Sequence, residues 1–310
     1  MLLGSDGKPP PDANDRNLAP YLILTKDRLS LSDSVRSGGY EMGVQKGAAN
    51  KARLVTQTTL KWAATKLLAT RYSFIFPQFF RVYSPWFEEA FRRDVFAPVS
   101  NLTLLTEDRC YLLDRLVRQT ALLEGEMAEC GVYRGGGALL MARAIAAARS
   151  EIGLPPPELH LFDTFEGMPE TSGADADVHS AGDFGDTSLE SVGKIMAPFP
   201  FSTLRPGLIP DSLRGLESRR FSFVHIDVDL YKSTVDCLDF FYPRLVPGGI
   251  MLFDDYGVTI YEFAEKKAVD EFFASRIEKP ISLTNGQTLV IKAPQVSAGQ
   301  AHYLAPHAIP

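Results

Sequence analysis

The 310-residue sequence predicts an α/β protein whose mostly parallel sheet carries helices on both faces. From Leu105 onward, short apolar segments typical of strands alternate with longer segments of helical spacing. A glycine-rich turn at residues 131–137 lies between the first of these strands and an alanine-rich helix. Near the end of the pattern, Asn285-Gly286 is a typical β-hairpin turn, so we expect a terminal antiparallel strand.

Two regions are expected before this pattern. Residues 1–20 are polar, and the run Lys8-Pro9-Pro10-Pro11 cannot enter a helix or sheet interior, so we expect a disordered leader. Residues 21–104 are expected to form an N-terminal helical cap, because residues 56–70 have helical spacing. The aromatic residues crowded between Tyr72 and Phe96 fit a packed cap, a lid over a substrate or a homodimer surface, and the sequence leaves these alternatives open.

The α/β domain itself is expected to span residues 105–292, with Thr106 placed to N-cap its first helix. The expected strands cover residues 127–132, 159–162, 202–205, 221–228, 250–253, 281–283 and 288–292. The expected later helices cover residues 138–149, 189–196, 234–245 and 266–275. Residues 293–310 have little material for a core, and we expect a flexible tail.

The composition argues against several classes of function. Subtracting 38 acidic from 32 basic residues gives a net charge of −6, which disfavours a nucleic-acid partner. No apolar window is long enough to span a membrane, and the N-terminus lacks the apolar core of a signal peptide. The scattered cysteines Cys110, Cys130 and Cys237 suit a reduced, cytoplasmic location and form no metal-type pair.

The first candidate site is the segment from Glu129 to Gly137, where a strand turns into a helix. Its glycines allow a tight turn and a close approach to a ligand, and the helix start offers free N–H groups. The spacing is neither GxGxxG nor that of a phosphate-binding P-loop. Asp163 ends the next strand, where an acidic residue can accept both hydroxyl groups of a ribose. The alternatives are a purely structural turn and an aspartate that caps a loop.

A second group of polar residues ends two later strands. His225, Asp227 and Asp229 lie on one side of the chain if their strand stays regular, and Asp254 and Asp255 end the next apolar strand. Four carboxylates converging at one sheet edge repel one another unless protons or a cation neutralise them, and Mg²⁺ suits such oxygen ligands. The alternatives are aspartates that cap loops in water and, for His225, a core residue rather than a catalyst.

Four segments together resemble the macrocin O-methyltransferase (TylF-type) family. They occur in the right order and spacing, and they are Ala128–Gly136, Phe162–Pro169, His225–Thr234 and Pro247–Gly257. The resemblance covers roughly residues 105–292 and implies a Rossmann-like class I methyltransferase sheet. It also implies an enzyme that uses S-adenosylmethionine and Mg²⁺ to methylate a sugar hydroxyl of a natural-product glycoside or a polysaccharide.

The resemblance further implies roles for individual residues. Asp227, Asp254 and Asp255 match metal ligands, Asp229 matches the general base, and Asp163 matches the residue that holds the cofactor ribose. The other expected contacts of the cofactor are Glu129, Gly131, Val132, Tyr133, Gly135, Gly136, Thr164, Phe165, Asp183, Gly207 and Asp227. One departure is visible, because residues 259–263 replace the Cys and Gly that often follow the Asp-Asp-Tyr-Gly motif.

Two other functions are alternatives for a sequence with these features. A nicotinamide-dependent oxidoreductase or epimerase acting on a nucleotide sugar would share the sheet and the acidic residue after the second strand. It is weakened by the missing GxGxxG motif and by carboxylates that would repel a pyrophosphate. A non-catalytic methyltransferase-like binding protein is the other alternative, and the intact acidic positions argue against it.

Overall fold

The computed structural model describes residues 83–171 and 178–294 of the chain. The expected leader, the expected cap up to residue 82 and the expected tail from residue 295 lie outside the described residues. No helix in the described part of the chain combines the length and the apolar character that crossing a bilayer requires.

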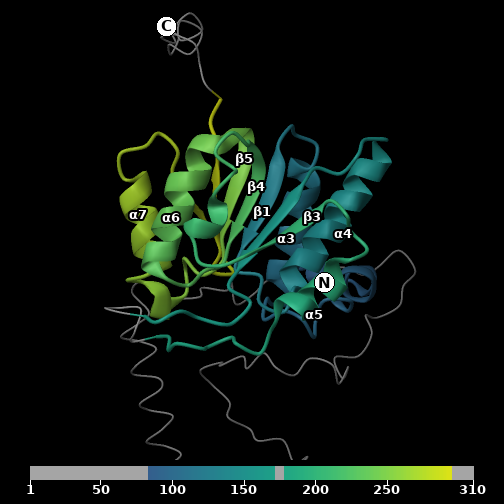
Figure 1. Ribbon diagram of the computed structural model, residues 1–310. Coiled ribbons are helices and arrows are strands. Elements are labelled where there is room, and N and C mark those ends of the chain that lie inside the picture. The colour runs from purple at the N-terminus through teal and green to yellow at the C-terminus, as the bar shows by residue number, and fades with distance from the viewer. Residues whose placement is uncertain (1–82, 172–177, 295–310) are drawn as a thin grey trace, which may run out of the picture. The chain divides into compact units, whose positions relative to one another are not determined.

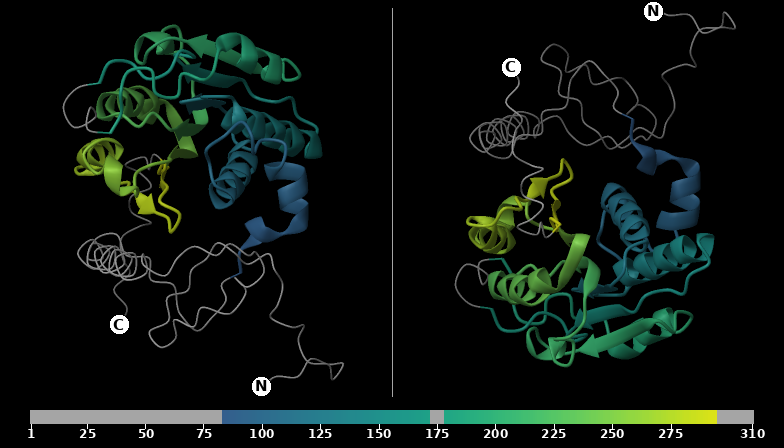
Figure 2. Two further views of the ribbon diagram at one scale, coloured as in Figure 1. Left: turned by 90° about the horizontal axis from the view of Figure 1, so that it is seen from below. Right: turned by 90° about the horizontal axis from the view of Figure 1, so that it is seen from above.

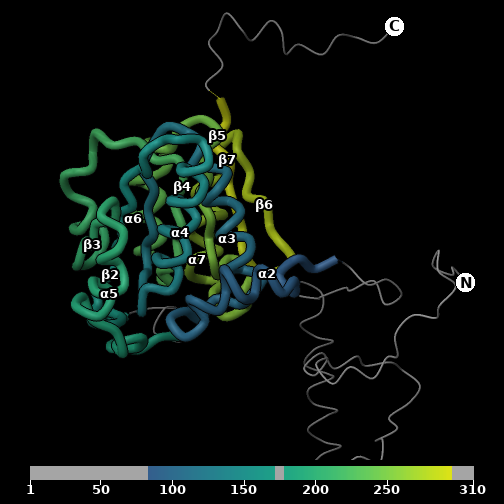
Figure 3. The backbone as a smooth tube through the Cα atoms, turned by 90° about the vertical axis from the view of Figure 1, so that its right-hand side faces the viewer, coloured from purple at the N-terminus to yellow at the C-terminus, as the bar shows by residue number. Residues whose placement is uncertain are grey.

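A seven-stranded sheet in the order β3-β2-β1-β4-β5-β7-β6 forms the centre of the protein (Figure 1). The strands are β1 (Glu126–Cys130), β2 (Leu159–Asp163), β3 (Ser202–Pro206), β4 (Phe221–Ile226), β5 (Leu245–Phe253), β6 (Ile281–Ser282) and β7 (Thr288–Ile291). The first five are parallel, whereas β7 is antiparallel to both β5 and β6. The expected mostly parallel sheet with an antiparallel end is confirmed, and Figure 3 shows β2 and β3 at the edge opposite β6 and β7.

Helices cover both faces of this sheet (Figure 2). The longer helices are α3 (Glu107–Thr120), α4 (Gly136–Glu151), α5 (Leu189–Met196), α6 (Tyr231–Phe241) and α7 (Glu265–Phe273). Side chains of α3, α4 and α5 share one core with the sheet, and side chains of α6 and α7 share the other. The strands supply both cores by alternation, so that Phe223 of β4 enters the first core and Val224 the second.

Short helical segments precede α3, and they pack onto the same core. They are η1 (Pro85–Phe87), α2 (Glu89–Phe91) and η2 (Arg92–Phe96). Phe91 and Val99 are buried among residues of α3 and α4, and Trp86 and Phe96 pack against them. The described end of the aromatic segment therefore behaves as packed structure, while residues 72–82 lie outside the described residues.

The structure changes some element boundaries in ways that matter for the site. Short helices η4 (Asp211–Leu213), η5 (Tyr242–Arg244) and η6 (Thr259–Tyr261) complete the connections. The strand expected to reach Val228 ends at Ile226, level with Cys130 of β1 and Phe253 of β5. Asp229 then adopts a left-handed backbone with φ of 59°, so the expected regular alternation does not extend to it. Thr106 occupies the expected N-cap position, but its side chain makes no capping hydrogen bond.

Candidate active site

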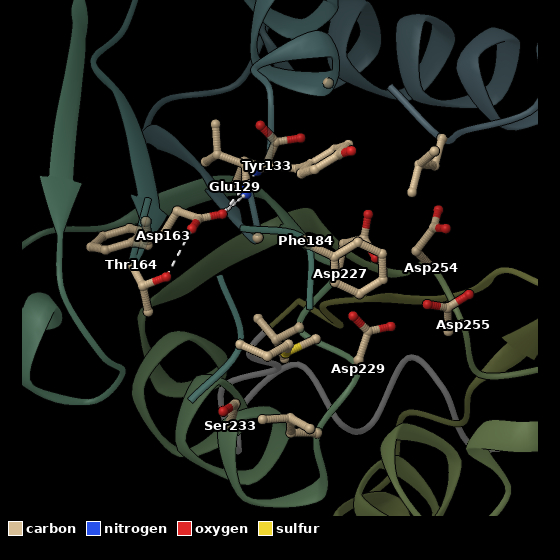
Figure 4. A pocket seen from close by; sticks show the side chains of 18 of the residues that line it. Glu129, Tyr133, Asp163, Thr164, Phe184, Asp227, Asp229, Ser233, Asp254 and Asp255 are labelled. Carbon is tan, nitrogen blue, oxygen red and sulfur yellow. Dashed lines mark hydrogen bonds between the residues drawn. The ribbon is translucent and has the colours of Figure 1, made fainter. Parts of the chain in front are cut away.

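A cavity of about 300 Å³ opens where β1, β2, β4 and β5 end (Figure 4). Eleven of the residues expected to act in a site line it, and they are Glu129, Gly131, Val132, Tyr133, Asp163, Thr164, Gly207, Asp227, Asp229, Asp254 and Asp255. We call the part formed by residues 129–137 and 163–165 the glycine-turn side. We call Asp227, Asp229, Asp254 and Asp255 the carboxylate cluster. Figure 4 shows Asp163 and Thr164 on one side and Asp229, Asp254 and Asp255 on the other.

The glycines of the turn have different tasks. A Cβ atom on Gly131 would lie 1.8 Å from the carbonyl oxygen of Asp227, so only glycine lets the ends of β1 and β4 approach this closely. Gly135 has φ of 87° at the N-cap of α4, and a Cβ on Gly136 would lie 2.6 Å from Thr103. Gly135 and Gly136 therefore shape the turn and the helix start, and neither is among the residues that line the cavity.

Asp163 ties the ends of β1 and β2 together. Its Oδ2 accepts the backbone N–H groups of Val132 and Tyr133 at 2.7 and 2.8 Å. Its Oδ1 accepts the backbone N–H of Phe165 at 2.7 Å. The hydroxyl of Thr164 lies 3.4 Å from this oxygen and donates its hydrogen to the carbonyl oxygen of Gly167 at 2.7 Å. A carboxylate offers about four acceptor positions, so these contacts match the alternative in which Asp163 caps loops.

The remaining expected cofactor residues occupy different places. Gly207 lines the cavity and donates its N–H to the carbonyl oxygen of Asp163 at 2.9 Å. Phe165 is buried in the core, with φ of 56°, and is not among the lining residues. The side chain of Asp183 is 45% exposed and accepts the N–H of Ser180 at 2.9 Å. Asp183 is also not among the residues that line the cavity.

Glu129 and His225 connect the two sides of the cavity. His225 is fully buried, with Nδ1 3.1 Å from Glu129 Oε1 and Nε2 3.5 Å from Asp254 Oδ1. Burial opposes a charge on His225, but its interactions with Asp254 and Glu129 outweigh burial and raise its pKa to about 10. The buried imidazole is thus a core residue, as in the alternative, and it lies between two acids. Burial raises the pKa of Glu129, whose Oε2 is buried with no partner among the described residues.

The carboxylate cluster is crowded, and three of its four members are buried while Asp227 is partly exposed. Asp254 is 2% exposed, Asp229 8% and Asp255 9%, which disfavours the alternative of loop caps in water. Ligand atoms within 4.8 Å of one another form two groups that share Asp227, one with His225 and Asp254 and one with Asp229 and Asp255. Burial, followed by the neighbouring carboxylates, raises the pKa of Asp227, Asp229 and Asp255. The second group offers oxygen ligands alone, which suits a hard divalent ion, whereas the expected ligands Asp227, Asp254 and Asp255 are divided between the two groups.

Asp254 differs from the other members of the cluster because donors surround it. Arg109 of α3 donates Nη1 to Asp254 Oδ2, and Gln287 donates Nε2 to Asp254 Oδ1 at 2.6 Å. Burial works against the charge, yet contacts with His225, Arg109 and Gln287 hold the pKa of Asp254 below its usual value. Sequence reasoning missed Arg109 and Gln287, since neither belongs to a segment that carries the resemblance.

Three further polar residues border the cluster. Glu265 accepts the N–H of Asp255 at 2.9 Å, and its other carboxylate oxygen is buried with no partner among the described residues. The hydroxyl of Tyr261 lies 3.0 Å from His179 Nε2, and the two rings stack. Burial, followed by the charge of Asp229, raises the pKa of Tyr261. Tyr261 belongs to residues 259–263, which depart from the family pattern. That departure could have indicated that this residue borders the site.

Comparison with known proteins gives a consistent family match. The family model described as macrocin-O-methyltransferase (TylF) matches residues 83–289, which extends the resemblance into the segments before α3. An 8-demethyl-8-(2,3-dimethoxy-alpha-L-rhamnosyl)-tetracenomycin-C 4'-O-methyltransferase of Streptomyces olivaceus is 33% identical over 52% of this chain and 63% of its own length. A mycinamicin III 3''-O-methyltransferase of Micromonospora griseorubida is 27% identical over 47% of this chain and 63% of its own length. The chain thus spans less than two thirds of these relatives.

Solved structures share the fold. The O-methyltransferase NovP has a TM-score of 0.54 and 23% identity over 62% of this chain and 83% of its own. The calicheamicin methyltransferase CalS11 has a TM-score of 0.50 and 20% identity over 71% of this chain and 97% of its own. At these identities the likeness establishes the α/β arrangement alone.

Proposed function

The chain belongs to the macrocin-O-methyltransferase (TylF) family, and on that premise we propose that it is an S-adenosylmethionine-dependent sugar O-methyltransferase. In this proposal a divalent ion such as Mg²⁺ binds the carboxylate cluster. The observation that carries the proposal is one continuous cavity with the glycine-turn side at one end and the cluster at the other. A methyl donor and an acceptor hydroxyl can meet only where both parts border the same space.

The relatives support a sugar as the acceptor class. One of them is named for a tetracenomycin that carries a methoxylated rhamnosyl group, and the other is named for mycinamicin III. We therefore propose a hydroxyl group on the sugar of a natural-product glycoside or a polysaccharide. The cavity volume of about 300 Å³ is at the lower end of ordinary ligand pockets.

The glycine-turn side suits S-adenosylmethionine on chemical grounds. The unpartnered Glu129 Oε2 is a buried acceptor of the kind that an ammonium group satisfies. Gly131, Val132, Tyr133 and Thr164 would border the cofactor. Asp163 would act on the ribose chiefly by fixing the turn, since its own oxygen atoms already accept hydrogen bonds. Asp183 does not line the cavity, so its loop would have to move toward the cavity for this residue to contact the cofactor.

The chemistry of the reaction needs a proton acceptor and stabilisation of an alkoxide. When bound, S-adenosylmethionine supplies an electrophilic methyl group, and a divalent ion supplies positive charge near the acceptor oxygen. Asp227, Asp254 and Asp255 would hold the ion, and Asp229 would take the proton of the acceptor hydroxyl. Burial raises the pKa of Asp229, which makes its carboxylate a stronger base. Tyr261, which lies 3.0 Å from His179 Nε2 and interacts with Asp229, would help to orient that carboxylate.

The first test is calorimetric titration of the purified chain with S-adenosylmethionine, with and without Mg²⁺, and with NAD as a parallel ligand. We expect micromolar binding of S-adenosylmethionine at one site per chain and no binding of NAD. Binding of NAD alone would favour the oxidoreductase alternative. Absence of binding for both ligands would favour a non-catalytic protein.

The acceptor is the second quantity to test. Incubation with S-adenosylmethionine, Mg²⁺ and a panel of glycosides should release S-adenosylhomocysteine only with acceptors that carry a free sugar hydroxyl. The matched control for each glycoside is its sugar-free aglycone. Turnover of the aglycones in place of the glycosides would contradict the sugar class while leaving methyl transfer intact.

A further inference from the structure

A permanent positive charge already lies inside the carboxylate cluster. Arg109 projects from α3, and only 15% of its side chain is exposed. Its Nη1 donates to Asp254 Oδ2 and lies 3.3 Å from Asp255 Oδ1. A guanidinium group does not lose its proton in proteins. Two of the proposed ion ligands are therefore in contact with a fixed cation before any metal arrives.

The surrounding structure holds this guanidinium in place. Its Nε donates to the carbonyl oxygen of Asn285 at 3.4 Å, in the turn between β6 and β7. A Cβ atom on Gly286 would lie 3.2 Å from its Nη2, so the glycine leaves room for the group. Three separate segments, α3, the end of β5 and the β6–β7 turn, thus meet at Arg109. Such convergence indicates a fixed position rather than a loose surface ion pair.

The contacts divide the cluster into engaged and open carboxylates. Both oxygen atoms of Asp254 have donors, from Arg109 on one and from Gln287 on the other. Asp227 accepts no hydrogen bond from a side chain in the described part of the chain, and it belongs to both candidate ligand groups. An entering ion would find Asp227 open, but it would share Asp254 and Asp255 with the guanidinium.

Building on the proposed function, in which this cluster binds a divalent ion, we propose that Arg109 is the internal counter-cation of the cluster. It holds Asp254 and Asp255 in position while no divalent ion is bound, and its charge weakens the binding of that ion. The reason is electrostatic, because a guanidinium and a divalent cation attached to the same carboxylates repel each other across a few ångströms of low-dielectric protein. Arg109 is a positioning residue in this scheme.

Magnesium affinity tests the proposal without any acceptor. The full chain, freed of metal by dialysis against chelator, is titrated with MgCl₂ in a calorimeter, and its unfolding temperature is measured in chelator. We expect Arg109→Gln to bind Mg²⁺ at least about tenfold more tightly than the wild type and to unfold at a lower temperature in chelator. Arg109→Lys keeps the charge, so its Mg²⁺ affinity should stay within about threefold of the wild type.

Two matched variants separate charge from hydrogen bonding and from general stability. Gln287→Met removes a donor to the same carboxylate without changing charge, so it should not tighten Mg²⁺ binding. Arg118→Gln breaks the ion pair with the buried Asp114 on the same helix, 3.0 Å apart, and should lower stability with no change in Mg²⁺ affinity.

Several outcomes would overturn the proposal. Equal or weaker Mg²⁺ binding by Arg109→Gln would mean that the arginine organises the ligands instead of opposing the ion. If that variant does not fold, a tenfold tighter affinity in Arg109→Lys would contradict the charge argument, and an unchanged affinity would support it. Absence of Mg²⁺ binding in every variant would also reject the inference. Titration of the same samples with S-adenosylmethionine shows whether the proposed function has failed as well.

Discussion

The carboxylates on the two sides of the cavity differ in how their charge is stabilised. On the glycine-turn side, Asp163 accepts three backbone N–H groups at 2.7–2.8 Å, so its charge is satisfied by the turns that it joins. In the carboxylate cluster, burial and mutual repulsion raise the pKa of Asp227, Asp229 and Asp255. Asp163 is thus satisfied without a ligand, whereas Asp227, Asp229 and Asp255 call for protons or a cation.

This difference indicates where ligand binding should change the protein. A turn that is already fixed can receive a ligand with little loss of freedom. A group of buried like charges gains stability from any cation that neutralises it. Variants should therefore separate the two sides, with His225 as the residue that connects them.

The largest effect is expected from Asp255→Ala. Loss of a proposed ion ligand should abolish methyl transfer and the dependence on Mg²⁺ together, because the alkoxide would lose its stabilising charge. The affinity for S-adenosylmethionine, measured by calorimetry, should stay unchanged if the two sides are independent. Full activity of the wild type in chelator would remove the role of the ion.

Asp229→Asn should lower turnover by about 10²–10⁴-fold, the usual contribution of a general base. The substitution keeps the shape of the side chain and removes its ability to take a proton. Methyl-transfer kinetics at saturating ligands and calorimetry with S-adenosylmethionine measure the two effects separately. Asp211→Asn, at an exposed ion pair with Arg214, is the control. Equal losses in turnover and cofactor binding would argue against a base.

Glu129→Gln tests the glycine-turn side alone. We expect the affinity for S-adenosylmethionine to fall by about 10–100-fold, because a charged hydrogen bond contributes about 1.5–3 kcal/mol. The control is Glu126→Gln at the other end of β1, where the carboxylate lies 2.7 Å from His160 Nε2. If both variants weaken binding equally, the unpartnered oxygen of Glu129 has no special role.

His225→Gln should destabilise the metal-free protein in a pH-dependent way. The folded pKa of about 10 lies above the usual value of about 6.5, so the stabilisation is fully present below about pH 6.5 and is lost as pH rises through 10. We expect the free energy of unfolding of the variant to be lower than that of the wild type by about 1–3 kcal/mol at pH 6. This difference should shrink toward pH 10. Urea unfolding of both proteins at the two pH values measures it. If the difference in unfolding free energy instead grows with pH, a stabilising positive charge on His225 is contradicted.

The smallest effect is expected from Tyr261→Phe. The hydroxyl of Tyr261 contacts His179 Nε2, which lies 3.9 Å from Asp229 Oδ1, so its loss should loosen the proposed base. We expect turnover to fall by about fivefold, which corresponds to one ordinary hydrogen bond. Cofactor affinity should not change. Tyr242→Phe, which removes a 2.6 Å hydrogen bond to Glu278 away from the cavity, controls for loss of a partly buried hydroxyl. An unchanged turnover would mean that Asp229 is held by other contacts.

Much of the fold could be predicted because its signals are local. The helix at Leu189–Met196 has the expected ends, and the hairpin around Asn285-Gly286 joins β6 to β7 as expected. The predicted end of a strand was wrong where pairing with neighbouring strands determines it. The strand expected to continue to Val228 stops at Ile226 because β1 and β5 end at the same level, and the regular placement of Asp229 is lost with it.

The acidic residues could be found from sequence because each directly follows a strand, and parallel strands bring their carboxyl ends to one edge. The partners of those residues could not be found in this way. Arg109 lies 145 positions from Asp254, and Gln287 lies 33 positions from it. Neither has a local pattern that distinguishes it from a surface arginine or a turn glutamine.

The sequence by itself therefore determined the alternation of elements, the glycine turn and the acidic strand ends, because periodicity and turn chemistry act over a few residues. Only the tertiary structure decided which charges meet. The strand order β1-β4-β5 sets His225 beside Glu129 and next to the strand that leads to Asp254. Packing of α3 against the sheet then brings Arg109 into the cluster. These contacts depend on how segments that are far apart in the sequence pack together. No short stretch of sequence contains that information.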